Sequence, residues 1–133
     1  MLLVIDVGNT RTKVFVYEQD AIVFNTAFNA EFFFEEILKI FQNYSKITHT
    51  VLSSVGKLED QIVQFLEEHS ILTVINSETN LPFDNLYATP KTLGVDRMVL
   101  AAGAVLKYPK QNRLVIDAGT CITYELLTKD GIY

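Results

Sequence analysis

The chain has 133 residues, a length that fits one domain with a sizeable hydrophobic core. With 49% hydrophobic and 20% charged residues, its composition is typical of a globular protein and excludes a disordered one. The net charge is −5 and Lys and Arg form no cluster, so we expect neither nucleic acid nor an anionic membrane as a partner.

Several classes of protein are disfavoured by what the sequence lacks. No apolar run approaches the roughly 20 residues of a membrane span. The first strand meets Asp6 without a preceding basic segment, which is unlike a signal peptide. The single cysteine, Cys121, excludes an internal disulfide, and with only His49 and His69 beside it there is no zinc-ligand spacing. We therefore expect a cytoplasmic protein.

Hydrophobic periodicity predicts an α/β protein with the element order β-β-β-α-β-α-β-α-β-β. The predicted elements are strands at 2–6, 12–18 and 21–27, a helix over 31–44, a strand at 50–54, a helix over 57–69, a strand at 72–75, a helix over 96–106, and strands at 113–117 and 121–127. This order favours one domain over residues 1–133, a mixed sheet with helices on its faces. The loop over 76–92 is long for a connector, which more often marks function.

Two similar turns are the most informative feature of the chain. They are Asp6-Val7-Gly8-Asn9-Thr10 and Asp117-Ala118-Gly119-Thr120, and each lies between two β-like stretches. Glycine lets backbone N–H groups approach a ligand closely, and hydroxyl and amide side chains add donors. A carboxylate at the end of the first strand suits a cation that accompanies a polyphosphate. The pair predicts a phosphate-binding turn that occurs twice.

An ordinary hairpin is the alternative for each turn, since Gly8-Asn9 also suits a type I′ turn. Two observations favour a ligand. Thr10, Thr12 and Lys13 add donors beside the first turn, and carboxylates that end buried strands are costly unless a cation or donors pair with them. The chain has no P-loop and no G-x-G-x-x-G sequence, which excludes a conventional nucleotide-binding fold.

A third element, Thr89 to Arg97, precedes the last predicted helix. Asp96 has an ordinary explanation, because it can cap the N-terminus of a helix that begins at Arg97. Arg97 in the first turn opposes the helix dipole, which favours an anionic ligand such as a substrate carboxylate. Asp96 would then be free to accept a hydroxyl proton.

These three elements, in this order, resemble the type III pantothenate kinases, members of the actin/Hsp70/sugar-kinase superfamily. The family's D-x-G-N-T motif corresponds to Asp6–Thr10, its D-x-G-T motif to Asp117–Thr120, and its substrate motif to Tyr87–Arg97. The resemblance extends from Met1 to about Leu127. It implies a ribonuclease H-like (actin-like ATPase) fold and the ATP-dependent phosphorylation of pantothenate to 4′-phosphopantothenate, the first step of coenzyme A biosynthesis.

The resemblance also implies roles for single residues. ATP would be bound by Asp6, Val7, Gly8, Asn9, Thr10, Arg11, Thr12, Lys13 and Thr120. Pantothenate would be bound by Tyr87, Gly94, Val95, Asp96 and Arg97. Asp96 would be the general base, Asp117 would bind a monovalent cation (K⁺ or NH₄⁺), and Mg²⁺ would accompany ATP near Asp6. The family further implies a homodimer.

The sequence departs from the family at Cys121 and Glu125, where members usually carry Ala and Asp, both mild changes; we expect Cys121 to be buried. The resemblance also implies a second, adenosine-binding domain, which we expect to lie outside these 133 residues, so we expect the chain alone to have little activity. One alternative is a non-catalytic relative that acts as a regulatory accessory protein. Another is a nuclease that holds two metals with Asp6 and Asp117, although Gly8-Asn9-Thr10 would then have no purpose.

Overall fold

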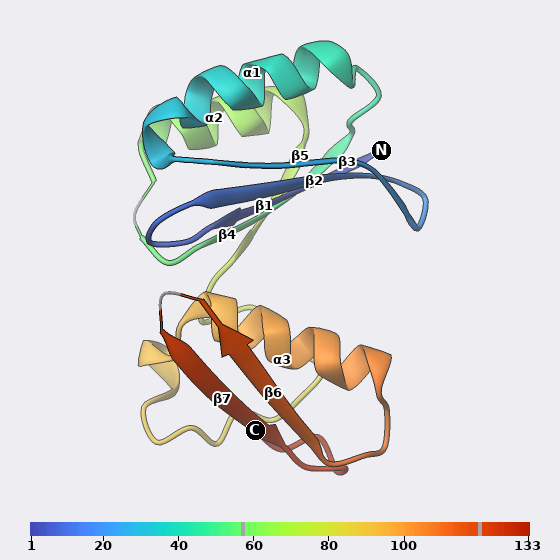
Figure 1. Ribbon diagram of the computed structural model, residues 1–133, viewed down its shortest axis with the longest axis vertical. Coiled ribbons are helices and arrows are strands. Elements are labelled where there is room, and N and C mark those ends of the chain that lie inside the picture. Colours follow the sequence, from blue (N-terminus) through green and yellow to red (C-terminus); the bar gives the residue numbers. More distant parts are fainter. Residues whose placement is uncertain (57, 120) are drawn as a thin grey trace. The chain divides into compact units, whose positions relative to one another are not determined.

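The computed structural model describes residues 1–56, 58–119 and 121–133. The described residues form two compact units, Met1–Ile75 and Asn76–Tyr133 (Figure 1). The chain is a mixed α/β protein, as the sequence predicted. The assignment of residues 1–133 to one domain stays a prediction, because the contacts gather separately within each unit.

The first unit contains a five-stranded mixed sheet with the strand order β3-β2-β1-β4-β5. Its elements are β1 (Leu2–Val7), β2 (Thr12–Glu18), β3 (Ala21–Phe28), a 3-10 turn (Ala30–Phe32), α1 (Phe33–Asn43), β4 (His49–Ser54), α2 (Asp60–His69) and β5 (Ile71–Ile75). The first three strands are antiparallel neighbours, whereas β1, β4 and β5 run parallel. This is the mixed sheet that the sequence predicted.

The core of the first unit lies on one face of this sheet. Alternate residues of β1, Leu3 and Ile5, are fully buried, and they pack in one cluster with Ile37 of α1 and Leu66 of α2. Both helices cover the same face of the sheet (Figure 1). The sequence predicted helices on the faces of the sheet, and in this unit α1 and α2 both lie on one of them. The period-two burial of β1 explains why the strand was recognisable in the sequence.

The second unit packs one helix against a two-stranded sheet. It contains a 3-10 turn (Pro90–Thr92), α3 (Val95–Lys107), β6 (Arg113–Ala118) and β7 (Ile122–Leu127). Strands β6 and β7 pair antiparallel with each other in a sheet of their own, so among the described residues they do not extend the five-stranded sheet. The prediction of a single sheet is corrected here.

The two faces of the β6–β7 hairpin differ sharply in exposure. One face is packed toward α3, with Leu127 and Glu125 buried. The other face is apolar and exposed, and it consists of Leu114, Ile116, Ile122, Tyr124 and Leu126. We call these five residues the outer hairpin face. The apolar run of β6 suggested a strand buried on both sides, and the structure buries only one of them.

Helix α3 begins at Val95, one residue before the start at Asp96 that the sequence predicted. Gly94 is its N-cap and Val95 its first residue, so Asp96 lies inside the first turn. The prediction that Asp96 caps a helix starting at Arg97 is wrong. The predicted start of α2 at Lys57 falls on a residue outside the described ones, and α2 begins at Asp60. None of the described helices has the length and apolarity needed to cross a membrane.

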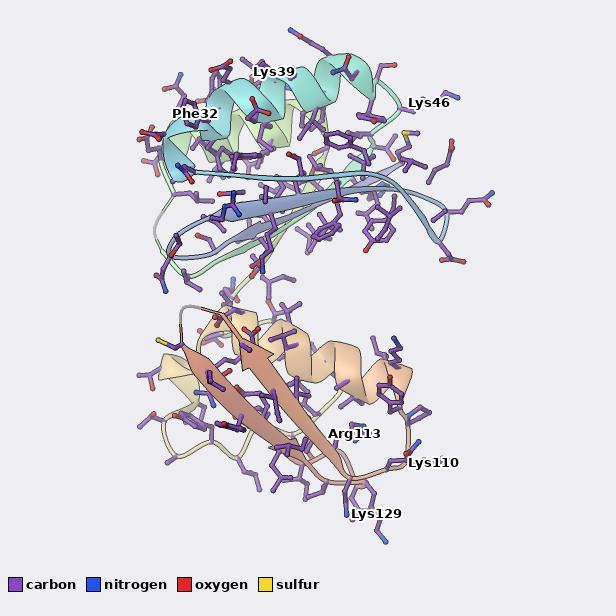
Figure 2. All side chains as sticks on the ribbon, viewed as in Figure 1. Phe32, Lys39, Lys46, Lys110, Arg113 and Lys129 are labelled. Carbon is purple, nitrogen blue, oxygen red and sulfur yellow. The ribbon has the colours of Figure 1, made fainter. Side chains whose placement is uncertain are left out.

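Arg113 provides a stability test of the second unit (Figure 2). Its buried guanidinium donates from Nε to the carbonyl of Tyr108 (2.6 Å), which ends α3, and from Nη1 to the carbonyl of Thr128 (2.9 Å), which follows β7. We expect Arg113→Met to lower the free energy of unfolding by about 2–3 kcal/mol, because two carbonyls lose a charged donor. Denaturant unfolding measures this.

The matched control is Lys39→Ala on the exposed surface of α1, where Lys39 pairs with Glu35 and Glu36. Exposed ion pairs contribute little to stability, so the midpoint of unfolding should not move. Equal unfolding curves for the Arg113 variant and this control would show that Arg113 does not hold the second unit together.

Candidate functional site

The first predicted phosphate-binding turn is a tight loop, Gly8–Arg11, that joins β1 to β2. The N–H of Gly8 donates to the carbonyl of Arg11 (3.1 Å), and a Cβ at position 8 would lie 3.2 Å from that oxygen. This close approach explains the glycine. In the described residues only Gln19, Lys110 and Gly131 have positive φ, so Gly8-Asn9 is not a type I′ turn. The type I′ geometry is ruled out, whereas β1 and β2 do form an antiparallel hairpin, so the choice between an ordinary hairpin and a ligand-binding turn stays open.

Asp6 lies between two polar neighbours in the sheet. It is opposite Lys13 on β2 and beside Ser53 on β4, so all three side chains project from the same face. Asp6 is half-buried, and the buried Oγ of Ser53 has no hydrogen-bond partner among the described residues. A carboxylate, an ammonium group and a hydroxyl therefore lie on the same face of the sheet near the end of β1.

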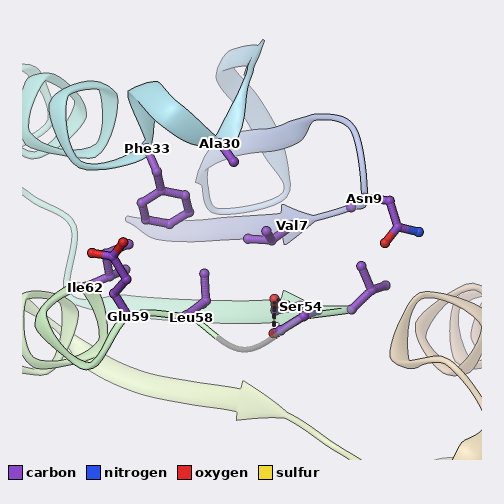
Figure 3. A pocket seen from close by; sticks show the side chains of 11 residues that line it. Val7, Asn9, Ala30, Phe33, Ser54, Leu58, Glu59 and Ile62 are labelled. Atoms are coloured by element: carbon purple, nitrogen blue, oxygen red, sulfur yellow. Dashed lines mark hydrogen bonds between the residues drawn. The ribbon is translucent and has the colours of Figure 1, made fainter.

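A cavity of about 310 Å³ opens on the other side of this loop (Figure 3). Its lining is mainly apolar, with Phe33, Leu58 and Ile62 grouped together, and its charged member is Glu59. Asn9 lies at the far end from that group in Figure 3. Gly8 and Asn9 of the turn line the same cavity, together with Ser54 of β4. The cavity thus has an apolar part beside α1 and a polar part at the turn.

The second turn repeats the construction of the first in the second unit. Asp117 is the penultimate residue of β6, as Asp6 is of β1. The N–H of Gly119 donates to the carbonyl of Cys121 (3.1 Å), which closes the loop as Gly8 closes the first one. Thr120, predicted to touch ATP, lies outside the described residues. The prediction of two strand–turn–strand units is confirmed.

The surroundings of the second turn differ from the expectation in two respects. Asp117 is exposed, so the argument from the cost of a buried carboxylate does not hold for it. Cys121 is also exposed, whereas we expected it to be buried. Asp117 shares the inward face of the hairpin with Glu125 and Leu127, and it is exposed at the end of β6, beside the turn; Cys121 precedes β7. Asp117 lies opposite Thr123 in the hairpin, so their oxygens share a face.

The substrate element predicted from the sequence passes through the 3-10 turn Pro90–Thr92 and ends in the first turn of α3. Asp96 is half-buried, and its Oδ1 accepts the backbone N–H of Arg97 (2.8 Å). A Cβ at position 94 would collide with that same Oδ1. Gly94 thus leaves the space in which the Asp96 carboxylate stands. The collision gives a steric reason for a glycine two residues before Asp96, at the N-cap of α3.

Arg97 makes a bidentate ion pair with Glu125. Its Nε donates to Oε1 and its Nη2 to Oε2, both at 2.7 Å, and Glu125 is 1% exposed. The Tyr133 hydroxyl donates to Oε2 as well. The ring of Tyr87 lies over the guanidinium, with 5.3 Å from Cζ to the ring centroid. The structure therefore brings Tyr87 and Arg97 together, two of the predicted substrate residues, in one polar cluster.

The ionisation of this cluster follows from its contacts. Burial favours the neutral form of Glu125, but the hydrogen bonds from Arg97 and Tyr133 outweigh it and lower the pKa of that carboxyl. The bond to Glu125 raises the pKa of Arg97, and burial together with Glu125 raises the pKa of the Tyr133 phenol. The pair is thus ionised and the phenol protonated at neutral pH.

Sequence reasoning missed the importance of Glu125 and Tyr133. Glu125 was noted only as a mild departure from a family pattern, and Tyr133 was not singled out. The available signal was the charge of Glu125 inside an apolar strand, since a buried acid requires a partner. Among the described residues no group of three His, Cys, Asp or Glu side chains could hold a metal ion.

Comparison with known proteins agrees with the motifs. The family model for type III pantothenate kinase matches residues 2–133. Relatives named type III pantothenate kinase include those of Flavobacterium psychrophilum and Flavobacterium johnsoniae, each 45% identical over 133 residues, and that of Christiangramia forsetii, 42% identical. Each match covers 100% of this chain and 54–55% of the relative. The chain belongs to the type III pantothenate kinase family.

The chain spans about half the length of the curated relatives it matches. Family membership therefore rests on an N-terminal half in which both turns and the substrate element are present.

Replacing Gly94 tests the steric account of Asp96. We expect Gly94→Ala to turn the Asp96 carboxylate away from its position while the fold remains, because the colliding atom is the end of a side chain that can rotate. A crystal structure of the variant measures this. Gly103→Ala, in the same helix with open space around it, is the control and should leave Asp96 in place. An unmoved Asp96 in Gly94→Ala would contradict the account.

Proposed function

We propose that this chain is the N-terminal part of a kinase that transfers a phosphoryl group from ATP to pantothenate, forming 4′-phosphopantothenate for coenzyme A biosynthesis. The observation that carries the proposal is the G-V-D-R element at Gly94–Arg97. Its glycine makes room for an acid and its arginine is held in a fixed orientation, within a chain that the family model matches over residues 2–133.

The ATP phosphates are assigned to the first turn. Gly8, Asn9, Thr10 and the neighbouring Lys13 supply backbone, amide, hydroxyl and ammonium donors at the end of β1, and these are the groups that bind polyphosphates. The proposed ATP-binding segment also includes Asp6, Val7, Arg11 and Thr12. Thr120 would contribute from the second turn. Phosphoryl transfer depends mainly on such positioning and on neutralised charge.

Two cations fit the carboxylates at the strand ends. Carboxylate and hydroxyl oxygens are the ligands of hard cations. Asp6 beside the unpartnered Ser53 hydroxyl suits the Mg²⁺ that accompanies ATP, and Asp117 opposite Thr123 suits a monovalent cation, K⁺ or NH₄⁺. When bound, the cations would neutralise charge on the phosphates.

Asp96 is assigned as the general base. Pantothenate would be held by Tyr87, Gly94, Val95 and Arg97 so that its hydroxyl faces the Asp96 carboxylate. Asp96 accepts the hydroxyl proton as the oxygen attacks the γ-phosphorus of ATP and ADP leaves. A carboxylate is sufficient because the loose transition state of phosphoryl transfer needs little activation of the alcohol. Arg97 would meet the substrate carboxylate with its remaining N–H groups.

The finer architecture is part of the same proposal. The sheet order β3-β2-β1-β4-β5, with three antiparallel strands followed by two parallel ones, is typical of a ribonuclease H-like or actin-like domain. The outer hairpin face is apolar and exposed, which suits contact with the remaining half of the protein. That half would supply the adenosine site.

The setting of the proposed enzyme follows from the family. We assign it to the cytoplasm as a homodimer whose ligands are ATP and pantothenate, with neither nucleic acid nor a membrane as partner. A regulatory accessory protein without catalysis would not need the space that Gly94 leaves for Asp96, so the kinase is favoured.

The test uses the protein at its natural length. We expect phosphorylated pantothenate, detected by mass spectrometry, when ATP, Mg²⁺ and K⁺ are all present, and at least about tenfold slower turnover when Na⁺ replaces K⁺, because Asp117 would lose its cation. The 133-residue chain alone should have little or no activity. The proposal fails if the natural-length protein makes no product. If the 133-residue chain matches the rate of the natural-length protein, the remaining half is not needed for catalysis.

A further inference from the structure

The Arg97–Glu125 pair fixes the orientation of the Arg97 guanidinium, which stability of the fold alone does not require. Two parallel hydrogen bonds of 2.7 Å hold the plane of the guanidinium, and the carboxylate that holds it is 1% exposed. A buried ion pair can often be replaced by apolar side chains without loss of stability. What apolar side chains cannot do is fix the direction of the N–H groups of an arginine.

The pairing also decides which N–H groups of Arg97 can serve a ligand. A guanidinium has five N–H donors, and Glu125 takes the one on Nε and one on Nη2. The others, on Nη1 and on the outer side of Nη2, can serve Tyr87 and a ligand. Since the side chain of Arg97 is 25% exposed, part of this outer edge is accessible.

Glu125 is itself held on its second oxygen. The Tyr133 hydroxyl donates to Oε2, the oxygen that also accepts Nη2 of Arg97. Tyr133 is fixed by its backbone, whose N–H donates to the carbonyl of Asp84 (3.0 Å) and whose carbonyl accepts the N–H of Leu86 (3.2 Å). This pairing lies next to Tyr87 in the chain, so the two tyrosines and the ion pair form one connected network.

We infer that Glu125 is a positioning residue for acceptor recognition, which holds Arg97 so that its outer edge faces the carboxylate of pantothenate. The inference rests on the proposed function and deepens it. Glu125 does not touch the substrate and acts through Arg97, while Tyr133 acts through Glu125. Because Glu125 also neutralises Arg97, the substrate carboxylate is recognised by the direction of the donors and less by net charge.

The test compares two substrates in the natural-length protein. One is pantothenate, and the other is the analogue whose carboxylate is replaced by a hydroxymethyl group and whose phosphorylated hydroxyl is kept. We expect Glu125→Gln to raise KM for pantothenate about ten- to hundredfold, the effect of one misplaced charged hydrogen bond, and to leave kcat within about threefold. KM for the analogue should not change.

Further variants separate positioning from folding. Glu125→Asp keeps the charge on a shorter side chain and should recover part of the affinity, and Tyr133→Phe should raise KM for pantothenate by a smaller factor than Glu125→Gln. Tyr108→Phe, an exposed tyrosine directly after α3 whose ring hydroxyl is not part of the network, is the matched control and should change nothing. If Glu125→Gln does not fold, the KM values of Glu125→Asp and Tyr133→Phe for the two substrates test the inference in its place.

Two results would overturn the inference. Equal losses for both substrates would mean that Glu125 only supports the fold, and a lower KM for pantothenate in Glu125→Gln would mean that Glu125 merely weakens the attraction of Arg97. The wild-type protein provides the separate check on the proposed function. If it phosphorylates neither substrate, the kinase assignment itself is wrong, a result distinct from an active enzyme whose variants behave alike.

Discussion

The second unit depends on the ion pair between Arg97 and Glu125. It joins the first turn of α3 to the buried face of β7 by two 2.7 Å hydrogen bonds, and it gathers Tyr87 and Tyr133 around it. Without Arg97, a carboxylate that is 1% exposed would have lost its charged partner. The orientation of Arg97, the packing of the helix on the hairpin and the order of the segment around Tyr87 are therefore linked.

The two turns show how one construction can serve two units. In both, an aspartate precedes the last residue of a strand, and a glycine N–H closes the loop onto the carbonyl that precedes the next strand. Glycine suits position 8 because a Cβ there would crowd the Arg11 carbonyl at 3.2 Å. The surroundings then differ, since Asp6 is half-buried among polar neighbours and Asp117 is exposed. The same local sequence thus leads to two different environments for the carboxylate.

Local features of this molecule could be predicted from the sequence and non-local ones could not. The strands, helices and both turns follow from short-range periodicity and from glycine, which act within a few residues. The pairing of Arg97 with Glu125 joins residues 28 positions apart, and no local pattern encodes it. The exposed outer hairpin face was missed for a related reason. Apolar residues on both faces of a strand look buried in sequence, whichever partner covers them.

The proposed role of Asp96 as the base that removes the proton from pantothenate can be tested by the single-turnover rate of Asp96→Asn in the natural-length protein. With ATP and pantothenate saturating, we expect the rate of phosphoryl transfer to fall about a hundredfold or more while pantothenate still binds, because the amide cannot accept the proton. Transfer at the wild-type rate would mean that Asp96 is not the base.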